Sequence, residues 1–412
     1  MAPVKLPCDL EEEILSRLPP LSLVRSRTVC QHWNSLLHDK CFLNKHLARV
    51  RPQFIFLTES KAYSINIDLR TGGTDPAIEV HEVPSDFPYQ AIDLTHTTIT
   101  SCDGFLFRHF WKQGVAFWNP WLSQVGWIEY VNKSFHFCGV GYDYDSNVPE
   151  KRYKILGYLN CLRDVSDTYQ VTYKRIAVYE CSSRALKFLD APFKNWPTMD
   201  PLSLNGNLYW VTSDPDTHEC FIRSFDFSSE TFKTFCLLPC QKNHSRDQLV
   251  LAVYKGDGLS LLKQCYVTGE ISVWVTKEKM DEEEVVWISL MTLPTSNLPK
   301  LINKLCGISY FIFEKTLIMC CGDEETGAAS IYIVREDMCK KIQIAGQSFE
   351  YCFHEHGDLQ CCCGVADIFT LSTAYDVVSF HWGFREKNRE TDFLAKQILF
   401  AEQASLVLNI VT

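Results

Sequence analysis

The stretch LPCDLEEEILSRLPPLSLVRSRTVCQHW, residues 6–33, decides how the amino-terminal part of the chain folds. Asp9 can cap a first helix, because Glu12 three residues later completes a capping box. Apolar residues then follow at helical spacing, and a proline pair ends the helix. Ser22 predicts the start of a second helix. The stretch therefore predicts short helices joined by very little loop.

Two further helical patterns follow. Cys30, Trp33 and Leu37 share one stripe of a third helix, and Asp39 can cap a fourth that contains Phe42. A unit of about 40 to 50 residues without disulfides or metal seldom buries its own apolar surface. Because large exposed apolar patches mark interaction sites, part of this surface is expected to face a partner. Alternatively, the helices pack on the rest of their own chain.

The bulk composition is that of an ordinary soluble globular protein. The 412 residues are 46% hydrophobic and 22% charged, with a net charge of −10. No dense Lys/Arg block is present, so we expect no nucleic-acid partner. The start of the chain lacks the apolar core of a signal peptide, and no run of about 18 apolar residues predicts a membrane span. The nineteen irregularly spaced cysteines are expected to be free thiols in the cytoplasm or nucleus.

A β-strand pattern recurs along residues 52–350. Its clearest member is a strand with a large aromatic or aliphatic residue, at 63–67, 115–118, 176–179, 223–227, 271–275 and 331–334. Turn signals interrupt the strands that precede it, where Asn, Asp and Gly supply positive φ. These signals are Asp103-Gly104, Asn205-Gly206-Asn207 and Gly256-Asp257-Gly258.

The repeat length predicts a ring of sheets. By residue number, the spacings between successive anchors are 61, 46, 49 and 58 for Trp118, Tyr179, Phe225, Trp274 and Tyr332. A repeat of about 50 residues with four short strands is typical of a kelch-like β-propeller, here with about six to seven blades. Closure into a ring also removes exposed sheet edges. The loose spacing leaves a pair of β-sandwiches as an alternative.

The amino-terminal residues resemble the F-box over residues 4–48. The matching strings are Leu6-Pro7-x-Asp9-Leu10, Glu13-Ile14-Leu15-x-Arg17-Leu18-Pro19, Ser22-Leu23-x-Arg25-x-Arg27 and Val29-Cys30-x-x-Trp33. The resemblance implies docking onto a Skp-type adaptor, and through it onto the cullin and RING subunits of a ubiquitin ligase. The adaptor-binding positions that it implies are Leu6, Pro7, Leu10, Ile14, Leu15, Leu18, Pro19, Leu23, Val29, Cys30 and Trp33.

The β-rich body resembles the F-box-associated domain of plant F-box proteins. The strings WNPW (118–121), SLNGNLYW (203–210), FDF (225–227) and ISVWVT (271–276) follow in the family's order, and the match is strongest over 98–335. The resemblance implies an α+β multidomain protein, in which a small helical F-box precedes an all-β kelch-like propeller at 52–350. It also implies that the propeller selects a protein substrate for an SCF-type (Skp–cullin–F-box) ligase. Residues 351–412 depart from the family, so they leave the closure of the last blade open.

The sequence gives no catalytic, cofactor or metal motif. Gly-x-Ser-x-Gly, His-Glu-x-x-His and the Walker lysine are all absent, so we expect a non-catalytic protein without a cofactor. The residues Cys352, His354, His356 and 361–363 could supply zinc ligands, but without a Cys-x2-Cys pair we predict no metal site. Cys236 and Cys240 are expected to be free thiols rather than a redox pair.

Two alternatives concern the β body. The aromatic residues Trp111, Phe117, Trp118, Trp121 and Trp127 could line a ligand groove, although their alternation along strands favours a blade core. The body could also be a glycan-binding or hydrolytic propeller with accessory helices, because a fold alone does not decide function.

Overall fold

The computed structural model describes most of the β body and part of the helical unit. The described residues are 7–18, 23, 26, 29–36, 42, 53–58, 60–68, 76–83, 98–110, 112–120, 124–130, 132–143, 151–166, 169–189, 201–214, 217, 219–240, 246–277, 285–294, 298–301, 308–322, 328–335 and 338–353. The chain divides into two compact units, Met1–Asp367 and Ile368–Thr412, and the described residues all lie in the first. None of the helices among them is long and apolar enough to cross a membrane.

Helix α1 (Cys8–Leu15) begins two residues earlier than the capping box predicts, because its N-cap is Pro7 rather than Asp9. Pro7 occupies the cap position with φ −58° and ψ 142°, and its carbonyl accepts bonds from the backbone N–H groups of Leu10 and Glu11. The prediction that Asp9 caps this helix was wrong, because Asp9 already lies in the first turn. There its charge still interacts favourably with the helix dipole.

The other helical predictions are described only in part. Helix α3 spans Gln31–Leu36, and the Cys30 sulfur accepts a hydrogen bond from the Trp33 backbone N–H at 3.4 Å, as a cap does. Leu23, Ser26 and Phe42 are helical, and the remainder of the predicted second and fourth helices lies outside the described residues.

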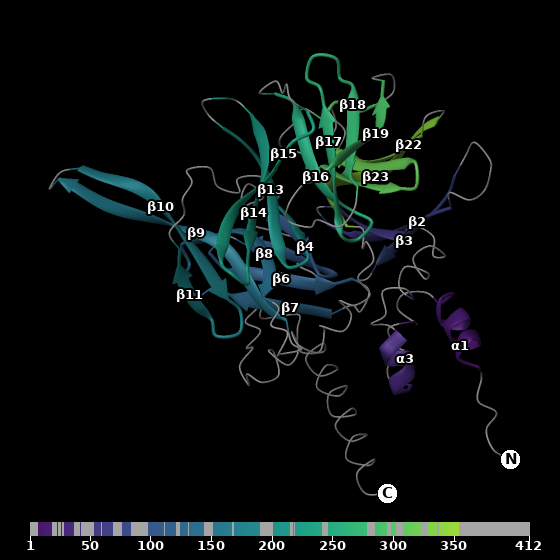
Figure 1. The fold of residues 1–412 in the computed structure, drawn as a ribbon, viewed down its shortest axis with the longest axis horizontal. Helices are drawn as coiled ribbons and strands as arrows, with labels where there is room; N and C mark the ends of the chain where they lie inside the picture. The colour runs from purple at the N-terminus through teal and green to yellow at the C-terminus, as the bar shows by residue number, and fades with distance from the viewer. Residues whose placement is uncertain are drawn as a thin grey trace, which may run out of the picture. The chain divides into compact units, whose positions relative to one another are not determined.

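The described strands of the body form antiparallel sheets that follow chain order (Figure 1). Blade 2 is β4 (Thr98–Cys102), β5 (Phe105–Phe110), β6 (Gly114–Asn119) and β7 (Gln124–Glu129); blade 3 is β8 (Phe135–Asp143), β9 (Arg152–Ser166), β10 (Tyr169–Glu180) and β11 (Ala185–Phe188). Blade 4 is β12 (Leu202–Leu204), β13 (Asn207–Ser213), β14 (Cys220–Asp226) and β15 (Thr231–Leu237); blade 5 is β16 (Gln248–Tyr254), β17 (Gly258–Gln264), β18 (Ile271–Thr276) and β19 (Trp287–Leu293).

One further sheet has seven strands and joins the two ends of the body. Its order is β20 (Ile308–Phe313), β21 (Thr316–Gly322), β22 (Ala328–Arg335), β23 (Met338–Phe353), β1 (Gln53–Thr58), β2 (Ala62–Asp68) and β3 (Ala77–Val83). Residues 338–348 of β23 pair with β22, and residues 349–353 pair with β1. β23 thus serves two blades. It is the outer strand of blade 6, which also contains β20, β21 and β22, and the inner strand of blade 1, which also contains β1, β2 and β3. The protein is a six-bladed β-propeller closed by β23, with pairing that reaches three residues past the predicted boundary at 350.

The repeat prediction is confirmed strand by strand. The six predicted aromatic or aliphatic strands coincide with the third strand of each blade, namely β2, β6, β10, β14, β18 and β22. Of the anchors, Trp118, Tyr179, Phe225 and Tyr332 are buried, and Trp274 packs partly buried against a core cluster. Phe117 is also buried and Trp127 packs partly buried, whereas Trp111 and Trp121 lie outside the described residues. The prediction that these aromatic residues form a blade core is therefore confirmed for those that the structure describes.

Tight turns lie where the Asn-Gly and Asp-Gly signals predict them, with one shift. Asp103 and Gly104 have φ values of 56° and 76°, and Asn205 and Gly206 have 51° and 80°. In the third case the positive φ values fall on Lys255 and Gly256 rather than on Asp257. The register explains the shift, because Tyr254 pairs with Gly258 and the three residues between them form the loop.

The hydrophobic core lies between blades. Ile55 and Leu57 of blade 1 pack with Leu106 and Trp118 of blade 2, and comparable clusters join blades 3 and 4, 4 and 5, 5 and 6, and 6 and 1. Between blades 2 and 3 the contact is aromatic. The ring centroids of Phe105 and Phe107 each lie 6.5 Å from that of Tyr153, within the range of aromatic packing. Each blade therefore buries both of its faces against neighbours.

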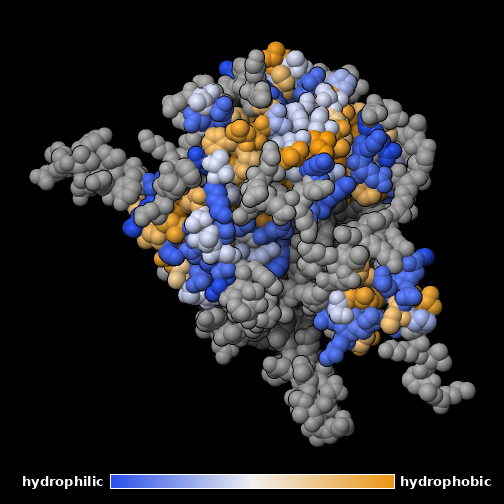
Figure 2. All heavy atoms as spheres, in the orientation of Figure 1, coloured by the Kyte–Doolittle hydropathy of each residue, from blue (hydrophilic) through white to orange (hydrophobic). Residues whose placement is uncertain are grey.

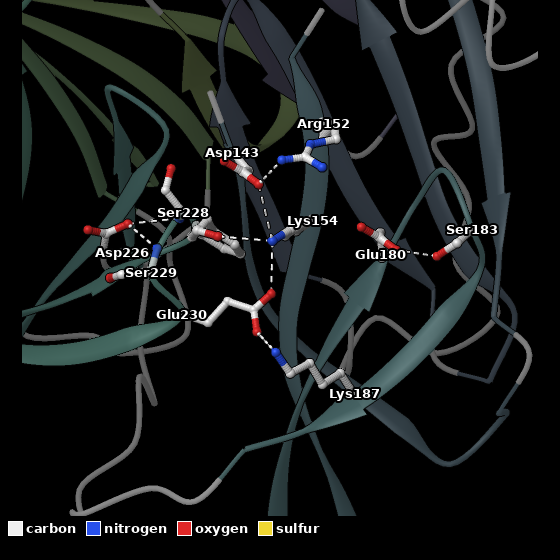
Figure 3. A network of polar contacts seen from close by, with 11 residues as sticks. Asp143, Arg152, Lys154, Glu180, Ser183, Lys187, Asp226, Ser228, Ser229 and Glu230 are labelled. Carbon is white, nitrogen blue, oxygen red and sulfur yellow. Dashed lines mark hydrogen bonds and ion pairs between the residues drawn. The ribbon is translucent and has the colours of Figure 1, made fainter. Parts of the chain in front are cut away.

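Charged side chains add a second connection between blades 3 and 4 (Figure 3). Lys154 on β9 donates to the Glu230 carboxylate at 2.8 Å and to the Phe227 carbonyl at 3.1 Å, both in the β14–β15 turn. Lys187 on β11 reaches the other Glu230 oxygen at 2.5 Å. Because the Lys154 side chain is only 7% exposed, these partners satisfy a charge that would otherwise be costly to bury.

A similar contact ties blade 3 to blade 2. Lys151 donates to both carboxylate oxygens of Asp103 at 2.7 Å, and the Tyr153 hydroxyl donates to the same carboxylate at 2.6 Å. The Asp103 side chain is 1% exposed. Blade 3 is therefore anchored on both sides by ion pairs whose carboxylates are largely shielded from water.

Ring closure by β23 gives a first prediction. A chain ending at residue 348 lacks the segment that pairs with β1, so we expect its thermal unfolding midpoint to fall by about 10 °C or more. A chain ending at residue 367 keeps the first compact unit and should unfold like the full chain. Circular dichroism measures both, and equal midpoints for the two truncated chains would contradict closure by residues 349–353.

The charge network gives a second prediction. Burial raises the pKa of Glu230, but the hydrogen bonds from Lys154 and Lys187 outweigh it and hold the pKa below its ordinary value. Glu230→Gln should therefore lower the free energy of unfolding by about 1–2 kcal/mol at pH 7.

The pH dependence follows from the lowered pKa. The stabilisation is complete above the unfolded carboxyl pKa of about 4.3 and is lost as the pH falls through the lower folded pKa. The difference between the wild type and Glu230→Gln should accordingly shrink below about pH 4.3 in urea unfolding. A difference that stays constant down to about pH 3 would argue against this role for Glu230.

Candidate adaptor-binding site

The helical unit has a small core of its own. Leu15 and Leu23 are 0% exposed and Phe42 is 1% exposed, and the partly buried Leu18, Trp33 and Leu36 pack against them. Leu15 ends α1, and Trp33 and Leu36 lie on α3, so the cluster joins the two helices. These side chains set how the helices present their outer faces.

A buried carboxylate fixes the contact between the two helices. The Trp33 indole Nε1–H donates to Glu11 Oε2 at 2.8 Å, and His32 Nε2 lies 3.8 Å from the same oxygen. Glu11 is only 9% exposed. A buried carboxylate without a donor is costly, so the indole bond holds α1 against α3.

The outer face of the unit carries exposed apolar side chains. Leu10 and Ile14 are 51% and 50% exposed, and lie one helical turn apart on α1. Val29, just before α3, is 63% exposed. Figure 2 shows apolar surface interspersed with polar surface over α1 and α3. Aliphatic side chains at half exposure or more are suited to fill a groove on another protein.

The predicted adaptor-binding residues divide into two groups. Pro7, Leu10, Ile14, Val29 and Cys30 are exposed. Leu15 and Leu23 lie in the core, and Leu18 and Trp33 are partly buried against it. Leu6 and Pro19 lie outside the described residues.

Helical spacing alone could not separate these groups, because both sets fall on apolar positions of the same short helices. Sequence reasoning also missed Glu11. The available signal was the need of a half-buried indole for a hydrogen-bond acceptor. Glu11 and Leu15 lie four residues apart and therefore share one buried stripe of α1.

Comparison with known proteins assigns the two regions to families. Residues 4–45 match the family described as F-box domain, and residues 53–362 match the family described as F-box associated beta propeller domain. The chain belongs to the F-box proteins with an F-box associated β-propeller, as the sequence resemblance predicts.

Close relatives are plant proteins. The chain is 63% identical over 358 residues to F-box protein At3g17710 of Arabidopsis thaliana, an alignment that covers 86% of this chain and 95% of that protein. It is 54% identical over 359 residues to the Arabidopsis thaliana protein SUPPRESSOR OF NIM1 1, covering 82% of this chain and 93% of that protein.

The division of the helical unit into core and outer face gives a third prediction. Leu15→Ala removes a fully buried side chain and should destabilise the unit by about 2–4 kcal/mol. Ile14→Ala, next to it in sequence but half exposed, should change stability by no more than about 0.5 kcal/mol. Hydrogen exchange of residues 8–36 reports both, and equal loss of protection in the two variants would contradict the assignment.

Proposed function

We propose that this protein is the substrate-recognition subunit of an SCF-type ubiquitin ligase. Its helical unit binds a Skp-type adaptor, and through the adaptor the protein joins the cullin and RING subunits. The observation that carries the proposal is the exposure of Leu10, Ile14 and Val29 within the region that matches the F-box. Burying such side chains in a groove contributes about 1.5–3 kcal/mol each when burial is complete.

The buried residues have a supporting part in this proposal. Leu15, Leu23 and the Glu11–Trp33 bond hold α1 and α3 in one arrangement, so the exposed side chains need not be ordered during binding. Preorganisation of this kind raises affinity because less conformational freedom is lost on association.

The propeller binds the protein substrate in this proposal, and the protein performs no chemistry itself. It contributes proximity, which raises the effective concentration of substrate lysines near the ubiquitin-conjugating enzyme. The cysteines among the described residues, Cys236 and Cys240 included, are free thiols, which supports the expected location in the cytoplasm or nucleus.

A glycan-binding or hydrolytic propeller was the alternative. Such a function needs polar or acid–base side chains that converge on one pocket. The described part of the chain provides no observation that favours it, and it holds no group of three or more His, Cys, Asp or Glu side chains placed to bind a metal. The zinc candidates from His354 onward lie outside the described residues.

Adaptor binding gives a fourth prediction. Leu10→Glu combined with Ile14→Glu places two charges on the outer face of α1 and should weaken binding to a Skp-type adaptor by about 100-fold or more. The matched control is Leu237→Glu combined with Val267→Glu, because both residues are exposed apolar side chains of the propeller. Isothermal titration with purified adaptor measures both variants. Unchanged affinity for the α1 variant, or equal loss in both, would count against the proposal.

A further inference from the structure

The β9–β10 hairpin of blade 3 is longer than the other two strands of its sheet (Figure 1). Pairing between β8 and β9 ends at Leu159, and pairing between β11 and β10 begins at Ala177. The two long strands continue to pair with each other as far as Ser166 and Tyr169. We call residues 160–166 and 169–175 the arm.

Within the part of the chain that the structure describes, the outer edge of β10 in the arm has no strand paired to it. Residues 169–175 pair with β9 on one side, and no described strand pairs with them on the other. The last described contact on that side is the bond from the Leu189 backbone N–H to the Ile176 carbonyl at 3.0 Å. Extended backbone of this kind can add a strand from another chain.

Two cations stand at the base of this edge. The Lys174 ammonium lies 4.4 Å from the centroid of the Tyr158 ring, and the Arg175 guanidinium lies 3.9 Å from the centroid of the Phe188 ring. Both cationic side chains are exposed, and among the described residues neither has a carboxylate partner. The aromatic contacts orient the cations without neutralising them.

The placement of the cations specifies the chemistry of an occupant. Lys174 and Arg175 are consecutive, so their side chains point to opposite faces of the strand. A strand added beside them would present one side chain to each cation if it carried two consecutive acidic residues. In a chain with a net charge of −10, such an unneutralised pair of cations is suited to an acidic segment.

Blade 3 also holds the base of the arm rigidly. Ion pairs connect it to both neighbouring blades, between Asp103 and Lys151 on one side and between Glu230 and Lys154 on the other. The His136 ring stacks on the Tyr158 ring, which also contacts Lys174, and the centroids of the two stacked rings are 4.7 Å apart. A docking edge on this blade is therefore fixed relative to the rest of the propeller.

We propose that the open edge of β10 binds the protein substrate by strand addition, and that it takes an extended segment with two adjacent acidic residues. Backbone N–H and C=O groups of residues 169–175 supply the pairing, and Lys174 and Arg175 select the acidic pair. This inference deepens the proposed function, on which it rests for the identity of the bound segment as a substrate.

The experiment uses the full chain and fluorescent model peptides of about eight residues. One peptide has a Glu-Glu pair in a Thr/Val background, the second has Lys-Lys at the same positions, and the third is the Glu-Glu peptide with alternate backbone amides N-methylated. Fluorescence anisotropy should show binding of the first peptide alone, because N-methylation removes the donors that a strand needs. Equal binding of the Glu-Glu and Lys-Lys peptides, or of the N-methylated peptide, overturns the proposal.

Two variants locate the site. Lys174→Glu combined with Arg175→Glu should weaken Glu-Glu peptide binding about tenfold or more, whereas Lys277→Glu combined with Lys315→Glu should not. The control pair changes the net charge equally, at exposed positions on blades 5 and 6. Replacing residues 161–173 by Asn-Gly shortens the arm and should abolish binding. Unchanged binding after shortening, or equal loss with the control pair, overturns the proposal.

The readouts separate this inference from the ligase role. The arm-shortened chain should retain its unfolding midpoint and its affinity for a Skp-type adaptor, since the helical unit is untouched. Arm-dependent dimerisation of the full chain without peptide binding would assign the edge to a second copy and overturn the inference. If the chain instead binds the peptide but no adaptor, the β10 edge stands as a peptide-binding site and the proposed ligase role is wrong.

Discussion

Packing between neighbouring sheets is the constraint on which the propeller depends. Among the described residues, the apolar side chains of each blade pack against those of a neighbouring blade, as Leu106 and Trp118 pack against Ile55 and Leu57. A linear row of such sheets would leave the apolar faces of its two end blades exposed to water. The ring covers both faces, and the price is that every interface must be present at once. Residues 349–353, which complete blade 1, therefore matter to blades far from them in sequence.

The sequence predicted the strands better than it predicted their closure. The third strand of each blade was found because a large buried residue, such as Trp118 or Phe225, recurs at the repeat length. The sequence predicted a range of about six to seven blades rather than a single number, because the repeat length varies with the length of the loops. Closure by β23 could not be predicted, because one strand serves two blades and its last residues pair with β1, at the other end of the propeller in sequence. Pairing of that kind depends on three-dimensional position rather than on any local signal.

The helical unit shows the same limit on a smaller scale. The F-box resemblance implied that Ile14 and Leu15 are both adaptor-binding positions, but it treated them alike although one is half exposed and the other is fully buried. Adjacent positions on a helix differ by about 100° in direction. On a short helix that packs against a small core, one residue can therefore be buried while the next one is exposed. The acceptor for Trp33 was also invisible, because the Glu11 bond crosses between elements. Only the tertiary structure distinguishes the side chains that form the core of the helical unit from those on its outer face.

The pairing of β23 with β1 has a consequence for biosynthesis. Phe353 lies opposite Ile55, so nearly the whole propeller must be synthesised before blade 1 acquires its inner strand. During translation the nascent chain carries an unmatched edge on its earliest blade while later blades emerge. Contacts between such distant parts of a chain form slowly, since loop-closure entropy is lost before they contribute. Completion of the ring is thus a late event, and until then the incomplete chain exposes apolar surface and an unpaired strand to its surroundings.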